Sequence, residues 1–181
     1  MKKTCVLLLM LSALAGVASA APGAMDPLWA QAMSVEWVNY QNPRFFYTAD
    51  YSTDFSRIQP LEDGSGLRME KDEEGGASLT LTGGRNSPEL DGRARLAARM
   101  KELKNVTESG ADTYWYRVVT ADNDAGRVVH EYACMHEEVW ASFTLEYSQD
   151  FGAVFVPRIV HMEENLLLPA IEHPIPDFGK R

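Results

Sequence analysis

Alternation of apolar and polar residues between Val139 and Tyr147 is the feature that most constrains the fold. Odd-numbered positions carry Val, Ala, Phe, Leu and Tyr, whereas even-numbered positions carry Trp, Ser, Thr and Glu. Because successive side chains of a β-strand point to opposite faces of its sheet, this segment is predicted to be a strand with one face in the core. Two strand-like segments, 112–120 and 127–135, precede it, and the three together predict an antiparallel meander.

Two hairpins are predicted ahead of the meander. Strand-forming residues at 35–40 and 44–51 lie on either side of turn-forming residues that include Asn42 and Pro43. The second hairpin joins 67–70 to 77–82 through a polar turn. The segment between the hairpins, 52–66, is rich in turn formers and charges and is predicted to be a loop.

Two helices are predicted to cover the sheet. Gly83 and Gly84 are expected to end the sheet pattern, and Ser87 and Pro88 to start a helix that runs to about Lys104. A second helix is predicted over 151–168, with Pro157 in its first turn and its regular part starting near Val156. Apolar stripes at helical spacing support both helices: Leu96, Met100 and Leu103 in the first, and Phe155, Ile159, Met162 and Leu166 in the second.

These elements predict an α+β fold with a single domain over residues 34–168. In it, an antiparallel β-sheet of about six to seven strands packs with two main helices. Residues 21–33 are predicted to be a flexible leader, and 169–181 an extended C-terminal tail.

The first 20 residues have the pattern of a secretory signal peptide. Lys2 and Lys3 precede an apolar run over 5–14, and Ala18-Ser19-Ala20 offers small residues for cleavage. The apolar run is shorter than the ~20 residues that a membrane span needs. We therefore expect a periplasmic or secreted protein without a membrane anchor after cleavage.

Charge and cysteine content narrow the classes of partner. Removal of residues 1–20 leaves 15 basic against 26 acidic side chains, a net charge of −11. Such a surface repels phosphate backbones and anionic headgroups, so neither nucleic acid nor a membrane surface is an expected partner. Cys134 is the one cysteine left after cleavage, which excludes an internal disulfide.

One cluster contains metal-ligand side chains: His130, Cys134, His136 and Glu138. Imidazole and thiolate are good ligands for zinc or copper, so a metal-binding protein is one hypothesis. Four residues of extended strand, however, separate His130 from Cys134 by roughly 13 Å, which is too far for one ion unless the strand bends. In the alternative interpretation Cys134 is a buried small hydrophobe and 136–138 form a polar hairpin turn.

Motifs of catalysis and cofactor binding are absent from the sequence. No Gly-x-Ser-x-Gly elbow occurs, and Gly83-Gly84 lacks the Lys-Ser/Thr of a phosphate-binding loop. We therefore expect a non-enzymatic protein without a cofactor, apart from the zinc or copper of the metal hypothesis.

A series of short motifs resembles a group of small exported bacterial proteins of unassigned function, which are similar to the Mog and PsbP-like superfold. The resemblance extends from about Tyr40 to Leu168. It implies an α-β-α sandwich that serves as a protein-binding or accessory module. The motifs are Tyr40-Gln41-Asn42-Pro43-Arg44-Phe45, Asp63-Gly64-Ser65-Gly66, Tyr114-Trp115-Tyr116, Gly126-Arg127-Val128, His130-Glu131, Phe143-Thr144-Leu145-Glu146-Tyr147 and Val156-Pro157.

The preferred hypothesis is an exported, non-catalytic accessory module that binds a protein or a small ligand. An exposed sheet face or the 52–66 loop would form the contact surface. Trp37, Trp115 and Trp140 are candidate contact residues if they are exposed, although core packing is the ordinary fate of a tryptophan. The sequence gives no indication of the oligomeric state.

Overall fold

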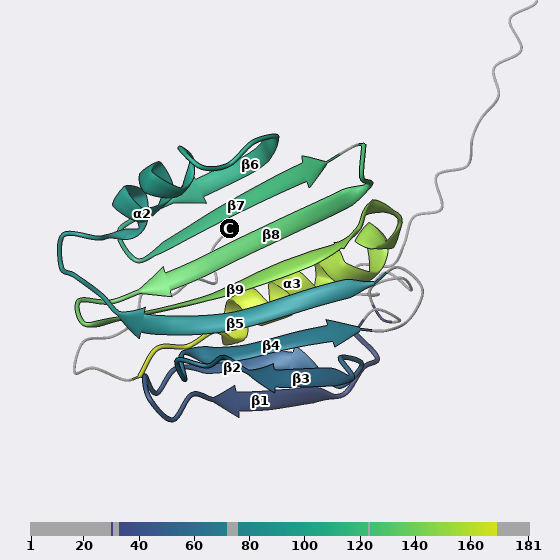
Figure 1. Cartoon of the computed structure of the whole chain (residues 1–181), viewed down its shortest axis with the longest axis horizontal. Helices are drawn as coiled ribbons and strands as arrows, with labels where there is room; N and C mark the ends of the chain where they lie inside the picture. The colour runs from purple at the N-terminus through teal and green to yellow at the C-terminus, as the bar shows by residue number, and fades with distance from the viewer. Residues whose placement is uncertain (1–29, 31–32, 72–75, 123, 170–181) are drawn as a thin grey trace, which may run out of the picture.

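The computed structural model describes residues 30, 33–71, 76–122 and 124–169 (Figure 1). The predicted signal peptide, nearly all of the leader, and the tail after Pro169 lie outside the described residues.

Seven strands form one antiparallel sheet, in the spatial order β3-β4-β5-β9-β8-β7-β6. A separate two-stranded sheet pairs β1 (Trp37–Gln41) with β2 (Thr48–Ser52). The predicted antiparallel sheet, both predicted hairpins and the three-stranded meander are thereby confirmed. The seven strands of the large sheet are β3 (Arg57–Pro60), β4 (Gly66–Lys71), β5 (Ala77–Arg85), β6 (Val106–Ala111), β7 (Trp115–Asp122), β8 (Arg127–Met135) and β9 (Val139–Ser148).

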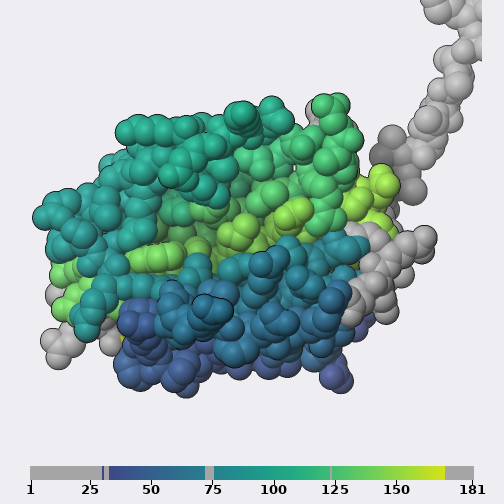
Figure 2. All heavy atoms as spheres, viewed as in Figure 1, coloured from purple at the N-terminus to yellow at the C-terminus, as the bar shows by residue number. Residues whose placement is uncertain are grey.

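Three layers make up the domain. Helix α2 (Gly92–Arg99) contacts β6, β7 and β8 on one face of the large sheet. Helix α3 (Gly152–Asn165) and the β1–β2 hairpin pack on the opposite face, and in Figure 1 α3 is partly hidden behind β5. In Figure 2 atoms of β8 and β9 (green) are visible between those of β6 and α2 above and those of β3 to β5 below, so α2 leaves part of its face uncovered.

The main core lies between the large sheet and the layer formed by α3 and the hairpin. Ala141, Phe143, Leu145 and Tyr147 of β9 are all buried on this side, as the alternation predicts. The predicted stripe of α3 is buried against them, with Phe155, Ile159, Met162 and Leu166 each at most 5% exposed. A smaller cluster under α2 is formed by Tyr116, Val118, Ala133 and Met135, with Leu96 and Leu103 packed on it.

The first helix starts later and ends earlier than predicted. Its N-cap is Asp91 rather than Ser87, and the Asp91 Oδ1 accepts a hydrogen bond from the backbone N–H of Ala94 at 2.8 Å. An aspartate at this position satisfies a free N–H of the first turn as well as a serine would. Met100, which was predicted to be part of the buried stripe, is 40% exposed because it follows the last helical residue.

Two edge strands and one strand end were missed. β3 lies within the predicted 52–66 loop, and its four residues are all exposed, so it lacks the alternation that marks a half-buried strand. β6 occupies 106–111, where no strand was predicted. The prediction that Gly83 and Gly84 end the sheet was wrong, because β5 continues to Arg85 and pairs Gly83 with Ala141 and Gly84 with Trp140.

Helix α3 begins at Gly152, directly after a 3₁₀ turn over Gln149–Phe151, and Pro157 lies inside it. The predicted regular start near Val156 was wrong. Proline lacks the N–H that would bond to the carbonyl one turn earlier, which costs a helix stability. Packing of Phe155 and Ile159 against the sheet compensates for that loss.

Candidate functional site

A fully buried asparagine, Asn42, builds the loop between β1 and β2. Its Oδ1 accepts hydrogen bonds from the backbone N–H groups of Arg44 (2.9 Å) and Phe45 (2.7 Å). Its Nδ2 donates to the carbonyl of Gly64 (3.1 Å) and to the hydroxyl of Tyr40 (3.0 Å). A side chain that satisfies several backbone groups at once fixes the loop in one conformation.

The same loop presents an aromatic side chain to solvent. Phe46 has a φ of 60° and is 60% exposed, the most exposed large apolar side chain among the described residues. A bulky residue with positive φ is strained, by about 1–3 kcal/mol, and persists only where its surroundings impose it. Here the Phe46 N–H donates to the Asn42 carbonyl at 2.9 Å. Strain of this kind is often found at functional sites, so the loop is a candidate contact region.

Tyr47, the next residue along the chain, fixes the position of the loop beside β5. Tyr47 is fully buried, and its hydroxyl donates to the Ser65 carbonyl at 2.9 Å. Burial raises the pKa of Tyr47 well above its usual range, so the hydroxyl stays protonated. Its ring lies against Gly83, where an added Cβ would be 2.6 Å from the Tyr47 Cε1. Glycine at 83 therefore allows the close approach that sets the loop beside the end of β5.

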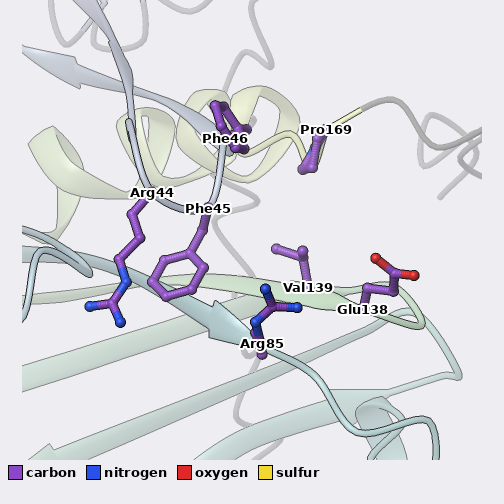
Figure 3. A pocket seen from close by; sticks show the side chains of 7 residues that line it. All are labelled: Arg44, Phe45, Phe46, Arg85, Glu138, Val139 and Pro169. Atoms are coloured by element: carbon purple, nitrogen blue, oxygen red, sulfur yellow. The ribbon is translucent and has the colours of Figure 1, made fainter.

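A hollow of about 600 Å³ opens where this loop meets three other segments (Figure 3). The hollow is lined by the loop, by the end of β5, by the β8–β9 turn and by Pro169, which follows α3. We call it the arginine pocket. Its lining residues are Arg44, Phe45, Phe46, Arg85, Glu138, Val139 and Pro169.

Two guanidinium groups dominate the charge of the arginine pocket. Arg44 donates to the Asp63 carbonyl and lies over the Phe45 ring, 5.1 Å from its centroid. Arg85 is exposed, and its guanidinium has no hydrogen-bond or ion-pair partner among the described residues. Hydrogen bonds from Ser65 lower the pKa of Asp63, whose carboxylate therefore partly balances the charge of Arg44. Arg85 is thus the more available cation.

The predicted metal-ligand residues do not converge. His130 and Cys134 both face α3, but β8 pairs with β9 in continuous register from Arg127 to Met135, so no bend shortens their separation. The His130 Nε2 is 3.0 Å from Glu163, and the Cys134 thiol lies 3.6 Å from the Leu166 carbonyl. Within the described ranges, no group of three or more His, Cys, Asp or Glu side chains is placed to hold a metal ion.

The other two members of that cluster lie in the β8–β9 turn. The N–H of His136 donates to the Val139 carbonyl at 2.8 Å, whereas the exposed Glu138 lines the arginine pocket. Cys134 itself is buried, and burial raises the pKa of its thiol to about 12. A thiol with so high a pKa is a poor nucleophile and a poor metal ligand. The geometry matches the interpretation of Cys134 as a buried hydrophobe and of 136–138 as a turn.

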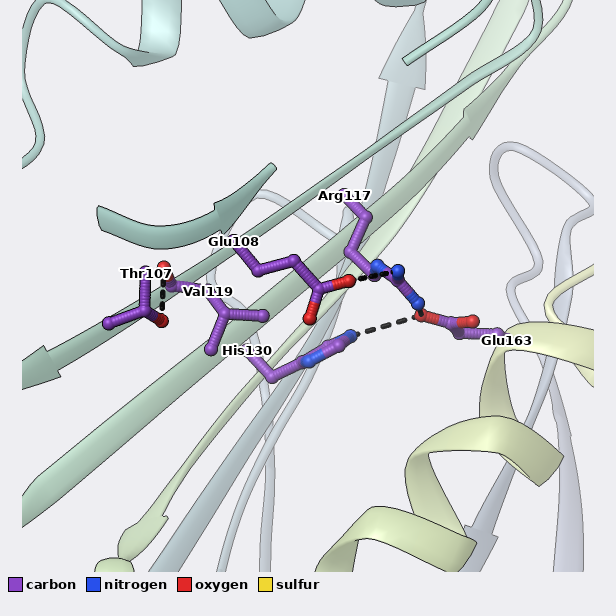
Figure 4. A network of polar contacts seen from close by, with 6 residues as sticks. All are labelled: Thr107, Glu108, Arg117, Val119, His130 and Glu163. Carbon is purple, nitrogen blue, oxygen red and sulfur yellow. Dashed lines mark hydrogen bonds and ion pairs between the residues drawn. The ribbon is translucent and has the colours of Figure 1, made fainter. Parts of the chain in front are cut away.

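His130 belongs to a network that joins the sheet to α3 (Figure 4). Glu163 of α3 accepts from His130 and lies 3.6 Å from the guanidinium of Arg117, which also pairs with Glu108. Only 8% of the side-chain surface of His130 and of Glu163 is exposed. A buried carboxylate is costly to leave without partners, and Arg117 and His130 both contact that of Glu163.

Two further polar clusters tie α3 to the β1–β2 hairpin region. His161 is 3.0 Å from Asp50 and stacks on Trp37, with ring centroids 3.9 Å apart. Asp54 accepts from Lys71 (2.8 Å) and Arg158 (2.7 Å). Burial acts to raise the pKa of Asp54, but these bonds and one from Ser52 outweigh it and lower the pKa to about 2. Both clusters join α3 to segments near the β1–β2 hairpin, and we interpret them as structural.

The three predicted contact tryptophans are all half-buried. Trp37 covers His161, and Trp115 packs against the main core and stacks on Tyr132 with centroids 6.3 Å apart. Trp140 lies beneath the guanidinium of Arg95, 4.8 Å from the ring centroid, at the edge of the α2 cluster. The structure therefore gives each ring a packing partner inside the protein.

Sequence reasoning missed the arginine pocket. Asn42-Pro43 was interpreted as turn chemistry, and Phe45 and Phe46 as part of a strand. A signal was present, since two consecutive aromatic residues directly after a turn leave one of them without a core position. The predicted 52–66 loop does contribute, because its residues 63–65 brace the β1–β2 loop.

The chain has a PsbP-like fold. No protein-family model matches it, and no curated protein matches it. Among solved structures, it is similar to the solution structure of cyanobacterial PsbP (CyanoP) from Synechocystis sp. PCC 6803, with a TM-score of 0.56. The match covers 84% of this chain and 99% of that one, at 9% sequence identity. Across the described residues, no helix is long and apolar enough to cross a membrane.

Proposed function

We propose that this protein is an exported, non-catalytic accessory module that binds a partner protein through the arginine pocket. One observation carries the proposal. Phe46 is held exposed, with a strained backbone, by the four side-chain hydrogen bonds of a fully buried asparagine. A loop preorganised in this way binds without an ordering cost, which is the usual advantage of a rigid contact loop.

The residue types of the arginine pocket support a protein partner. Phe45 and Phe46 lie beside Arg44 and Arg85, and aromatic residues and arginine are the types enriched at protein interfaces. A central exposed aromatic side chain next to a hollow is the arrangement of an interface hot spot. The end of β5 and the β8–β9 turn belong to the large sheet, and Asn42 fixes the β1–β2 loop, so we expect rigid-body docking.

Several observations favour binding over catalysis. The contacts of His130 with Glu163 and of His161 with Asp50, and the ion pair of Asp54 with Arg158, tie α3 to the rest of the fold. The buried Cys134 has a raised thiol pKa and is unsuited to nucleophilic attack. The PsbP-like fold agrees with this, because the resemblance found in the sequence implies an accessory or protein-binding module.

Site-specific photo-crosslinking in the native cells tests the proposal. A benzoylphenylalanine at position 46 should capture one discrete partner protein on irradiation. The matched control replaces Val156, which is apolar and 50% exposed on α3, far from the loop in sequence. Absence of any adduct from position 46, or the same adduct with equal yield from position 156, would contradict the assignment.

A further inference from the structure

We infer that the arginine pocket recognises a single carboxylate with an adjacent apolar side chain, as found in an acidic-hydrophobic segment of a partner protein. The inference rests on the proposed function and specifies the chemistry of the ligand. It starts from the lining of the pocket, where cationic and apolar side chains occur together.

Charge complementarity indicates a monoanion. Arg44 and Arg85 bring two positive charges to the lining, and Glu138 brings one negative charge. Figure 3 shows the Phe45 ring between the two guanidinium groups and Glu138 on the far side of Val139. A carboxylate can bind Arg85 in a bidentate manner. A dianionic phosphate would carry a second negative charge towards Glu138, on a protein whose full sequence already has a net charge of −9.

Arg85 is the residue expected to bind the carboxylate. It is exposed at the end of β5 and its guanidinium has no partner among the described residues, so binding costs no existing side-chain interaction. Arg44 is already committed to the Asp63 carbonyl and to the Phe45 ring. Arg44 therefore shapes the pocket wall and contributes long-range attraction.

The apolar side of the pocket specifies the rest of the ligand. Phe46 and Pro169 lie together on one side of the hollow in Figure 3, opposite Arg85. Burial of an apolar side chain against them favours binding in proportion to the apolar area removed from water. A free carboxylate such as acetate lacks this contribution, so a peptide with an apolar neighbour is the better ligand.

An NMR titration of the isotope-labelled protein tests the inference, with the Nε–Hε signals of arginine as reporters. The probe is acetyl-Phe-Glu-Leu-amide, and its matched control is acetyl-Phe-Gln-Leu-amide. The Arg85 signal should shift saturably, with a Kd of about 1 mM or tighter. The glutamine peptide should bind at least about tenfold more weakly, because a charge-assisted hydrogen bond is lost.

Substitutions test whether the arginine pocket causes the difference in affinity between the two peptides. Arg85→Gln should lower the affinity for the glutamate peptide to that of the glutamine peptide. Arg93→Gln, which changes an exposed arginine of α2, should leave the affinity unchanged. Glu138→Gln should tighten binding roughly twofold to threefold, since it removes a like charge from the rim.

Three outcomes would overturn the inference: equal affinity for the two peptides, no saturable shift at about 10 mM peptide, or tighter binding of acetyl-Phe-phosphoserine-Leu-amide than of the glutamate peptide. The third would assign the pocket to phosphorylated partners instead. Crosslinking from position 46 does not depend on ligand charge, so the proposed function can survive each of these results.

Discussion

Arg85 and Arg117 are arginines on strands of the same sheet, yet their surroundings differ. Arg117 pairs with Glu108 on one side and with Glu163 of α3 on the other. Arg85 is exposed beside a rigid loop, and its guanidinium has no partner among the described residues. The polar residues most suggestive of chemistry in the sequence hold the fold together, whereas a turn without any such motif forms the available surface.

Glu163→Gln should produce the largest loss of stability. It leaves His130 and Arg117 without the carboxylate that both contact, and removal of one partner from a buried ion pair costs about 3–5 kcal/mol. Chemical denaturation of the variant measures the change in the free energy of unfolding. Glu164→Gln, at the neighbouring exposed position, should change it by less than about 0.5 kcal/mol. Equal effects of the two substitutions would mean that the Glu163 network contributes nothing.

Asn42→Ala should rank second, with a loss of about 2–3 kcal/mol. The substitution leaves the N–H groups of Arg44 and Phe45 and the Gly64 carbonyl without their partner. Asn39→Ala is the matched control, because its amide makes one exposed hydrogen bond to Asp50. Hydrogen exchange should locate the change in residues 42–46. A loop whose exchange stays slow in Asn42→Ala would show that other contacts fix it.

Protonation of Asp54 at low pH should lower the free energy of unfolding by about 2 kcal/mol. The pKa of Asp54 is lowered to about 2 in the folded protein, against an ordinary value of 3.8. A depressed carboxyl pKa stabilises the fold above the unfolded value, and that contribution disappears as the pH falls from about 4 to about 2. The free energy of unfolding, measured across this pH range, should depend more steeply on pH in the wild type than in Asp54→Asn. Identical pH profiles would rule out the contribution of Asp54.

Phe46→Asn should have the smallest effect on stability, and in the opposite direction. Asparagine tolerates positive φ better than phenylalanine does, and the ring that is removed is already 60% exposed. We expect a gain of about 0.5–1 kcal/mol, measured as a raised melting temperature. A clear loss of stability would show that the ring packs on the protein instead of serving a partner.

The sequence predicted the sheet better than the site, and for physical reasons. Strict alternation over 139–147 reports burial of one face directly, so β9 and the α3 stripe were found. Edge strands β3 and β6 carry no such alternation, because both of their faces are largely accessible to solvent. The arginine pocket depends on four segments that are distant in the chain and on one buried asparagine, neither of which leaves a periodic pattern.

The metal hypothesis failed to identify a site because the sequence does not reveal which residues pack against one another. His130 and Cys134 share one face of β8, but Glu163 and Leu166 of the α3 region contact them there. A residue's chemical capacity is visible in the sequence, whereas its partner across the core is not. Contacts with residues distant in the sequence therefore determine which polar residues are structural.

The binding surface around Phe46 and the ion-pair network around Glu163 have separate roles, one in binding and the other in stability. The most direct test measures the affinity of Phe46→Asn and Glu163→Gln for the crosslinked partner at a temperature at which both variants are folded. We predict that Phe46→Asn loses about tenfold or more in affinity with its stability intact, a change typical of a hot-spot residue. Glu163→Gln should bind as the wild type does despite its lower stability. Unchanged affinity of Phe46→Asn together with weakened binding by Glu163→Gln would contradict the account.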